Sequence, residues 1–233
     1  MNIKELDREL ISDIIQWDVV NWSKSLEIWL KQSKQIDDNG GSALEIGARE
    51  GGISVLLTKL GFETTCSDVT NPLETAKPLH IKYQVFDAIK YEGIDVLNID
   101  TVPDGFNIVC FKSVLGALQE KDKQLKAFQQ IYKILKTDGE LWFAENLAGS
   151  FLHRNARKVF IPWHDIWRYM TSQEIKEMLD CCGYRDIILQ NYGFFGAFGR
   201  SEMQRQYLGY LDHLLNPLIP SNSKYIVFGI ARK

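Results

Sequence analysis

The sequence predicts an α/β domain built on a mostly parallel β-sheet. Short apolar segments typical of buried strands alternate with segments whose apolar residues recur every three or four positions, as in amphipathic helices. A glycine-rich turn, residues 47–52, joins the first such strand to the helix that follows it, as in nucleotide-binding sheets. Near the C-terminal end a helix precedes one last strand, residues 224–232, which indicates that this strand runs antiparallel to the others.

The elements follow in order along the chain. Apolar residues four positions apart predict helices over residues 5–34, broken near 18–23, in an N-terminal extension that spans 1–40. Asn71-Pro72 predicts a helix start, since proline at the first helical position lacks only an N–H that would have no partner. Thr171 and Glu174 form a capping box that begins a helix ending before Gly183. The other elements are expected at 43–46 (strand), 52–60 (helix), 62–67 (strand), 89–94 (strand), 106–111 (strand), 121–136 (helix), 140–146 (strand), 184–191 (strand) and 200–215 (helix).

Length and composition are those of an ordinary globular protein. The chain has 233 residues, of which 45% are hydrophobic and 24% charged, enough for one domain with a large core. A net charge of −3 argues against a large nucleic-acid partner, and no apolar run reaches the ~20 residues of a membrane span. The charged start, MNIKELDREL, is not typical of a secretory signal. We expect no metal site, because no zinc-ligand spacing occurs; the cysteines are interpreted as small buried side chains in a reducing cytoplasm: Cys66, Cys110, Cys181 and Cys182.

The glycine turn is the strongest indication of a ligand. Such a turn lets the backbone approach a bound molecule, and the helix that follows offers free N–H groups. Asp68 ends the second strand, 21 positions after Gly47, where an acid can bind a ribose diol. A dinucleotide fingerprint has glycine at the position of Arg49, so Arg49 argues against NAD or FAD. Glu45, just before the turn, is expected to accept N–H groups of the turn.

The pattern acid-x-Gly-x-x-x-Gly resembles motif I of class I S-adenosylmethionine-dependent methyltransferases. The resemblance extends over residues 43–233: FETTCSDVT is similar to the family's second strand, FKSVLGAL to the segment after its fourth, and ILKTDGELWFAEN to its fifth strand with the preceding turn. It implies a doubly wound, Rossmann-like three-layer sandwich with strand order 3-2-1-4-5-7-6, in a single domain over 1–233. It also implies that the cofactor is S-adenosylmethionine and the product S-adenosylhomocysteine.

The resemblance further assigns roles to individual residues. Asp68 would bind the ribose, Asp95 the adenine amino group, and the backbone N–H of Val96 the adenine ring. Asp87 competes with Asp95 but precedes its strand, and Asn107 stands where many members have aspartate, as a polar start to the fourth strand. The implied cofactor-binding residues are Glu45, Gly47, Ala48, Arg49, Gly51, Asp68, Val69, Asp95, Val96, Lys112 and Ser113.

Two segments are expected to form the acceptor side of the site. Residues 146–170 show no regular pattern, and residues 192–221 hold a glycine- and phenylalanine-rich turn with an inserted helix. Cations and aromatic rings crowd the first segment, where they would bind a phosphate or carboxylate and pack against a sugar, or would simply cover the core. The expected substrate-binding residues are Arg154, Arg157, Trp163, Trp167, Arg168 and Tyr169.

Histidines are the candidates for catalysis. An oxygen acceptor must lose a proton, and imidazole titrates near pH ~6.5, so His153 or His164 would serve as a general base. His80 and His213 fall on helices and are interpreted as surface residues. The N-terminal helices would either fold over the cofactor as a lid, through Trp17, Asp18 and Trp22, or pack against the flank of the sheet.

We therefore expect a cytoplasmic enzyme, monomeric or homodimeric, that methylates a small-molecule or glycan acceptor, most simply at a hydroxyl. The loop pattern R-K-x-F-x-P-W followed by W-R-Y-x-T-x-x-E is similar to that of bacterial methyltransferases found among cell-surface polysaccharide genes. Two alternatives stay open: an NAD-dependent oxidoreductase, and a catalytically silent relative that binds the cofactor.

Overall fold

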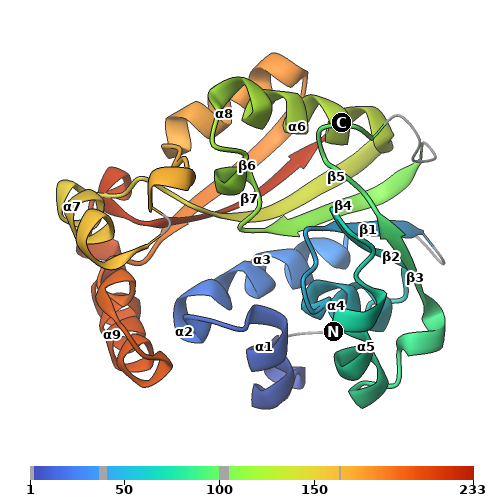
Figure 1. Ribbon diagram of the computed structural model, residues 1–233, viewed down its shortest axis with the longest axis horizontal. Coiled ribbons are helices and arrows are strands. Elements are labelled where there is room, and N and C mark those ends of the chain that lie inside the picture. Colours follow the sequence, from blue (N-terminus) through green and yellow to red (C-terminus); the bar gives the residue numbers. More distant parts are fainter. Residues whose placement is uncertain (1–2, 37–40, 100–104, 163) are drawn as a thin grey trace.

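A computed structural model describes residues 3–36, 41–99, 105–162 and 164–233. Within these ranges seven strands form one sheet in the order β3-β2-β1-β4-β5-β7-β6 (Figure 1). The strands are Ser42–Ile46 (β1), Glu63–Asp68 (β2), Ile89–Gly93 (β3), Phe106–Lys112 (β4), Leu135–Asn146 (β5), Arg185–Tyr192 (β6) and Ile226–Arg232 (β7).

Parallel pairing brings the carboxyl ends of the inner strands to one edge of the sheet. β1 lies between β2 and β4 and pairs in parallel with both, and β4 pairs in parallel with β5. In this register Ile46, the last residue of β1, pairs with Ser67 of β2 and Phe111 of β4. The turns that follow these strands therefore meet at the same edge. β7 runs antiparallel to both β5 and β6, so the predicted strand order and antiparallel last strand are confirmed.

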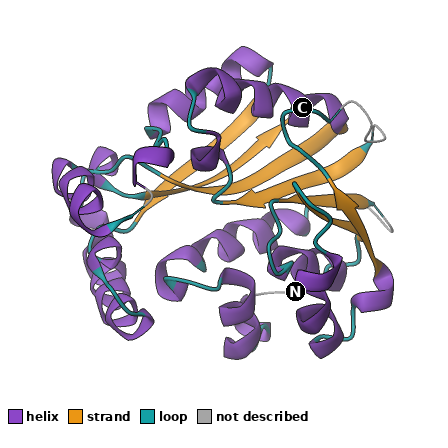
Figure 2. Cartoon of the chain, in the orientation of Figure 1, coloured by secondary structure: helices purple, strands orange, loops and turns teal. Residues whose placement is uncertain are grey.

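Helices cover both faces of the sheet, which gives three layers (Figures 1 and 2). α1, α3, α4 and α5 lie on one face, α6 and α8 on the other, and α7 and α9 stand at the end of the molecule beside β6 and β7. The helices are Arg8–Ile15 (α1), Val19–Trp22 (α2), Lys24–Ser33 (α3), Gly52–Lys59 (α4), Leu73–Lys82 (α5), Lys121–Ile134 (α6), Phe151–Phe160 (α7), Ser172–Cys182 (α8) and Glu202–Leu215 (α9).

The alternation of side chains along β5 builds a separate core on each face. Trp142 points to the N-terminal helices and stacks on Trp29 of α3, with ring centroids 6.5 Å apart. Phe143 points the other way and packs on Phe111 and on Phe128 of α6, at 5.6 and 6.1 Å. Successive strand residues face opposite sides of a sheet, so this one strand serves both cores. The N-terminal helices are thus part of the core. The expected break over residues 18–23 itself holds the short helix α2, so the described part of this extension contains three α-helices where the sequence indicated two.

Four sequence expectations need correction. Residues 146–170 are not irregular, because α7 occupies 151–160. Its start was not predicted from the sequence because His153 takes the place of the usual Glu or Gln in the capping box. β5 begins at Leu135, before the expected turn; Asp138 within it has φ 62°, and the pairing of β5 with β4 shifts register between Leu135 and Glu140. His80 is not a surface residue: it is fully buried, whereas His213 is exposed as expected. Cys181 is exposed instead of buried.

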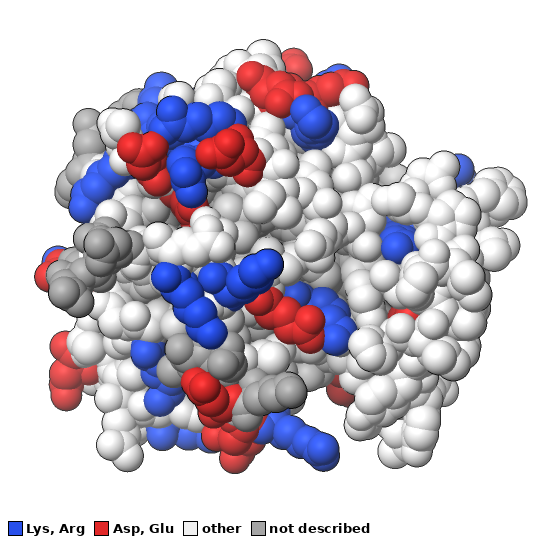
Figure 3. All heavy atoms as spheres, turned by 180° about the vertical axis from the view of Figure 1, so that it is seen from behind, with Lys and Arg blue, Asp and Glu red and all other residues white. Residues whose placement is uncertain are grey.

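The molecular surface carries mixed charge. On the face shown in Figure 3, Lys and Arg side chains are interspersed with Asp and Glu, and no broad region of one sign is visible. In the described part of the chain, none of the helices has the length and apolar character that crossing a bilayer requires.

Candidate cofactor and acceptor site

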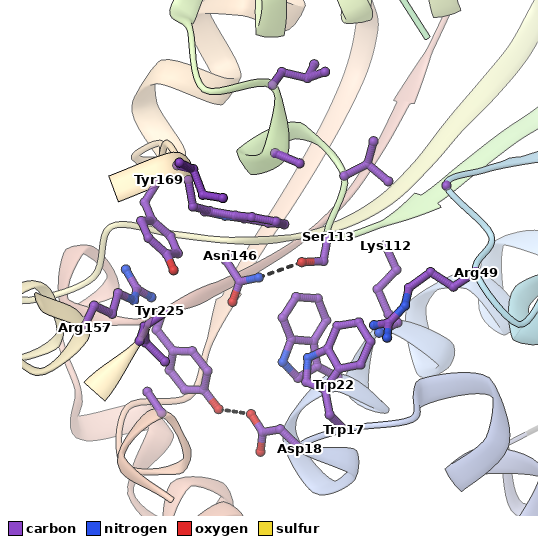
Figure 4. Close-up of a pocket in the computed structure, with 18 of the residues that line it drawn as sticks. Trp17, Asp18, Trp22, Arg49, Lys112, Ser113, Asn146, Arg157, Tyr169 and Tyr225 are labelled. Carbon is purple, nitrogen blue, oxygen red and sulfur yellow. Dashed lines mark hydrogen bonds between the residues drawn. The ribbon is translucent and has the colours of Figure 1, made fainter. Parts of the chain in front are cut away.

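A large cavity, about 1160 Å³, opens at the carboxyl edge of the parallel strands. The turns after β1, β2, β3 and β4 line one half of it; we call this the cofactor half. Residues of α2 and α7, the segment 166–169, the short helix Gly196–Phe198 and Tyr225 line the other, which we call the acceptor half (Figure 4). Cavities for single small ligands measure roughly 300–1,000 Å³, so this one has room for a cofactor and a small acceptor.

The glycine turn owes its path to positive φ angles at three alternate positions, 47, 49 and 51. Gly47 has φ 68°, and a Cβ there would lie 2.5 Å from Cγ2 of Val114, so the turn after β4 packs on a bare backbone. Arg49 has φ 52°, which L residues rarely adopt, and its N–H donates to Oδ2 of Asp68 at 3.0 Å. Gly51, with φ 72°, precedes α4 and packs on His80 of α5. Arg49 therefore takes the conformation of the glycine it replaces while its side chain points into the cavity (Figure 4).

Glu45 stabilises the turn from behind. It is 3% exposed, does not line the cavity, and accepts hydrogen bonds from the N–H and hydroxyl of Ser54 at 2.7 and 2.5 Å. Its partners thus lie in the first turn of α4, just beyond the glycines where we expected them. Burial raises the pKa of Glu45 to about 7 despite these bonds.

The acids that end β2 and follow β3 both line the cavity. Asp68 accepts the N–H of Val69 at 2.7 Å as well as that of Arg49. Asp95 accepts the N–H of Leu97 at 2.9 Å. Asp87 lies before β3 in the short helix Phe86–Ala88 and does not reach the cavity. The other predicted cofactor residues at the cavity are Gly47, Val69, Val96, Lys112 and Ser113, whereas Ala48 and Gly51 lie outside it.

Lys112 is a buried cation without a hydrogen-bond partner. Its side chain is 9% exposed, and Nζ lies 2.9 Å from the ring centroid of Trp17 and 5.2 Å from that of Trp22. The guanidinium of Arg49 is 5.4 Å from the same Trp17 ring (Figure 4). Burial is the main cause that lowers the pKa of Lys112 well below its usual range, and the positive charge of Arg49 is the second. Two cations thus converge on one region of the cavity, and neither forms an ion pair with an acid of the described residues.

The segment after β4 is held by β5. Glu145 is fully buried and accepts the N–H groups of Val114 and Leu115 at 2.9 and 2.8 Å. Next to it, Nδ2 of Asn146 donates to Oγ of Ser113 at 2.8 Å, inside the cavity (Figure 4). Asn146 thereby places an amide between the two halves of the cavity.

Of the predicted substrate residues, Arg157, Trp167 and Tyr169 line the acceptor half. The guanidinium of Arg157 lies 3.7 Å from the ring centroid of Tyr169 and donates to the carbonyl of Ala148 at 3.1 Å. Trp167 packs on Gly116, where a Cβ would meet its Nε1 at 1.8 Å.

The other predicted substrate residues do not reach the cavity. Arg154 is exposed and donates to the carbonyl of Gly149. Arg168 joins two helices, since it donates to Gln124 of α6 and Glu174 of α8 at 2.5 Å each. Trp163 lies outside the described residues.

Neither candidate histidine has a free nitrogen aimed at a substrate. His153 lines the cavity, but its Nδ1 accepts the N–H of Ser150 at 3.0 Å and its Nε2 contacts the carbonyl of Phe194 at 2.8 Å. The bond with Ser150 caps the N-terminus of α7, and burial lowers the pKa of His153. His164 does not line the cavity; its nitrogens contact the carbonyl of Ile161 and Asp165. The geometry thus favours structural roles for both.

Several cavity residues had only a weak signal in the sequence, or none. Trp17, Asp18 and Trp22 line the cavity, in agreement with the lid interpretation, although Trp22 also belongs to the core. Tyr225 immediately precedes β7 and lies 207 positions from Asp18, to which its hydroxyl donates (Figure 4). Among the described residues, no cluster of three or more His, Cys, Asp or Glu side chains is arranged to hold a metal ion.

A family model described as a methyltransferase domain matches residues 14–188. The comparison with curated protein sequences found no match.

Two solved structures illustrate the likeness of the fold. Phosphoethanolamine N-methyltransferase 2 of Haemonchus contortus, in complex with phosphomonomethylethanolamine and S-adenosylhomocysteine, is 20% identical and superposes with a TM-score of 0.63. That alignment covers 91% of this chain and 52% of the other, so this chain spans about half the length of the nematode enzyme. An S-adenosylmethionine-dependent methyltransferase from Archaeoglobus fulgidus is 15% identical with a TM-score of 0.61, over 90% of this chain and 94% of the other.

Proposed function

Because the chain belongs to the methyltransferase-domain family, we propose that it transfers a methyl group from S-adenosylmethionine to a hydroxyl of a small molecule or glycan. The observation that carries this proposal is the meeting of the glycine turn, Asp68 and Asp95 at one cavity that extends into a second, aromatic and cationic half.

The residues of the cofactor half fit S-adenosylmethionine. The carboxylates of Asp68 and Asp95 would accept hydrogen bonds from the ribose diol and the adenine amino group, and exposed Val69 would cover the flat adenine ring. Lys112 and Arg49 are two converging cations in need of an anion, and the carboxylate of the methionine part is one. The unpartnered Nζ of Lys112 supports this fit directly, since a buried ammonium without a partner is costly.

When bound, S-adenosylmethionine would supply a methyl group on a positively charged sulfur, and this sulfur would be a good leaving group because it departs as a neutral thioether. The protein therefore has to align an acceptor lone pair, exclude water and remove a proton. In Figure 4 Trp17 and Trp22 lie on one side of the cavity and Tyr169 on the other, and Trp167 also lines it. Arg157, whose guanidinium lies 3.7 Å from the ring centroid of Tyr169, would bind an anionic group of the acceptor, and the aromatic rings would pack against a sugar ring.

Binding and transfer experiments test the proposal. By calorimetry, S-adenosylhomocysteine should bind and NAD should not; binding of NAD alone would favour an oxidoreductase. Incubation with methyl-labelled S-adenosylmethionine and a protein-free metabolite extract should then yield a labelled small molecule, and boiled protein should yield none. Cofactor binding without any labelled product would support the catalytically silent alternative.

A further inference from the structure

A buried acid of the acceptor half has one oxygen without a partner. Asp18 is 3% exposed and lines the cavity. Its Oδ2 accepts the hydroxyl proton of Tyr225, whereas Oδ1 has no hydrogen-bond partner. An unsatisfied carboxylate oxygen in a protein interior is costly and calls for an explanation.

Asp212 shows what a purely structural acid looks like in the same neighbourhood. It is fully buried, and its two oxygens accept four hydrogen bonds, from Nδ2 of Asn21 and from the N–H groups of Phe194, Phe195 and Gly196. Asp212 has no capacity left for a further donor. Asp18, about equally buried, has no donor at Oδ1. The missing donor leaves the charged carboxylate less stabilised, so Oδ2 takes up the Tyr225 proton more readily.

The backbone around Asp18 is arranged to hold this geometry. Asp18 has φ 47° and ψ 47°, a left-handed conformation that costs energy for any residue other than glycine. The carboxylate of Glu202 accepts the N–H groups of Asp18 and Val19 at 2.8 and 2.9 Å, which fixes this conformation from α9. At Gly196 a Cβ would lie 3.1 Å from Oδ1 of Asp18 and 2.6 Å from the hydroxyl of Tyr225, so glycine keeps the pair from being crowded.

The surrounding charges poise Asp18 for proton exchange. Burial raises its pKa to about 7, against the opposing effects of the Tyr225 hydrogen bond and of Arg205. Glu202 and Asp212 of α9 raise the pKa further, and Lys112 faces the same region from β4. At neutral pH, a group with a pKa near 7 is the most effective general base.

From this geometry we propose that Asp18, acting through Tyr225, is the general base that removes the proton of the methyl acceptor. The inference rests on the proposed function. The acceptor O–H bond breaks and its electron pair stays on oxygen, ready to form the new bond to carbon. The proton passes to the Tyr225 oxygen as the phenol proton passes to the Asp18 carboxylate, and Asp18 later releases it to water. Asn21 orients the relay, since its Nδ2 donates to the Tyr225 hydroxyl at 2.8 Å and leaves the second lone pair free.

A direct titration tests the base without knowledge of the acceptor. In protein labelled with ¹³C at aspartate carboxyl groups, Asp18→Asn identifies the Asp18 signal, which should titrate near pH 7. In Tyr225→Phe the midpoint should move to higher pH, because the bond that stabilises the carboxylate is lost. Asp13→Asn, in the same N-terminal extension but outside the cavity, should leave the midpoint unchanged. A midpoint near the ordinary value of ~4 would overturn the proposal.

The transfer assay separates this inference from the proposed function. With the metabolite extract, the wild-type rate of label transfer should rise with pH through about 7, because the base is the deprotonated form. Asp18→Asn, which keeps a partner for Tyr225, should lower the rate by ~100-fold or more and remove this rise. Affinity for S-adenosylhomocysteine should be unchanged. If Asp18→Asn transferred label as fast as the wild type, Asp18 would not be the general base, and the proposed function would be unaffected. If the wild-type protein bound no S-adenosylhomocysteine, the proposed function itself would be refuted.

Discussion

The two halves of the cavity are built in different ways. In the cofactor half, ligand-facing groups sit at the ends of β1, β2, β3 and β4 and on the turns that follow them. Hydrogen bonds from backbone N–H groups, such as that of Arg49 to the Asp68 carboxylate, fix these turns. In the acceptor half, Asp18, Arg157 and Tyr225 come from distant segments and are held by side chains, through Tyr169 and Asn21. Ligand binding in the cofactor half should therefore be sensitive to substitutions that crowd the backbone. Binding in the acceptor half should be sensitive to the loss of individual side chains.

The largest effect on cofactor binding is expected from a single added methyl group. Gly47→Ala places a Cβ 2.5 Å from Val114 at φ 68°, so the turn has to move away from the segment after β4. We expect affinity for S-adenosylhomocysteine, measured by calorimetry, to fall by ~100-fold or more. Gly61→Ala is the control, since Gly61 also has positive φ but no atom within 4 Å of its Cβ position. Equal affinities in the two variants would contradict a backbone-built half.

The next largest effect should come from Lys112→Met. Loss of a charge-assisted bond in a buried site costs about 1.5–3 kcal/mol, or roughly 10- to 150-fold in affinity for S-adenosylhomocysteine. 5′-Methylthioadenosine has the same nucleoside and sulfur but lacks the carboxylate, so its affinity should not fall. Lys90→Met, at an exposed position on β3, should change neither value. An equal loss for both ligands would remove Lys112 from the carboxylate site.

A smaller effect should separate the two candidate adenine acids. Asp95→Ala should weaken S-adenosylhomocysteine binding by about 1 kcal/mol, or roughly 5-fold, since it removes one hydrogen bond at the cavity edge. Asp87→Ala should have no effect on binding, because Asp87 does not line the cavity. The reverse result would exchange their roles.

The smallest effect on cofactor binding is expected from the acceptor half. Arg157→Met should leave affinity for S-adenosylhomocysteine within about 2-fold of wild type, while label transfer at limiting metabolite extract should fall, because the contact with the acceptor is lost. Arg154→Met, one turn away on α7 and outside the cavity, should leave both measurements unchanged. If Arg157→Met weakened cofactor binding as much as Lys112→Met, the division into two halves would be wrong.

Particular residues show why the cofactor half was the easier to predict. The periodicity of strands and helices, and the places of Gly47 and Asp68 at strand ends, can be read from a few neighbouring residues. Parallel pairing then brings the ends of neighbouring strands together, so no distant contact has to be known. The helix α7 was missed because a histidine closes its capping box, and His80 was misplaced because its burial depends on contact with Gly51 and Tyr91. Local patterns do not report such contacts.

The sequence by itself determined the order of elements, the sheet and the residues that end its inner strands, because these follow from periodicity and from turns of a few residues. Only the tertiary structure decided which side chains share the acceptor half. Asp18 and Tyr225 meet across 207 positions because α2 packs on α9 while β7 enters the sheet between β5 and β6. Whether a titratable group is buried, paired or free depends on all the elements around it at once. The sequence therefore led us to expect a histidine as the base, whereas from the folded chain we propose an aspartate.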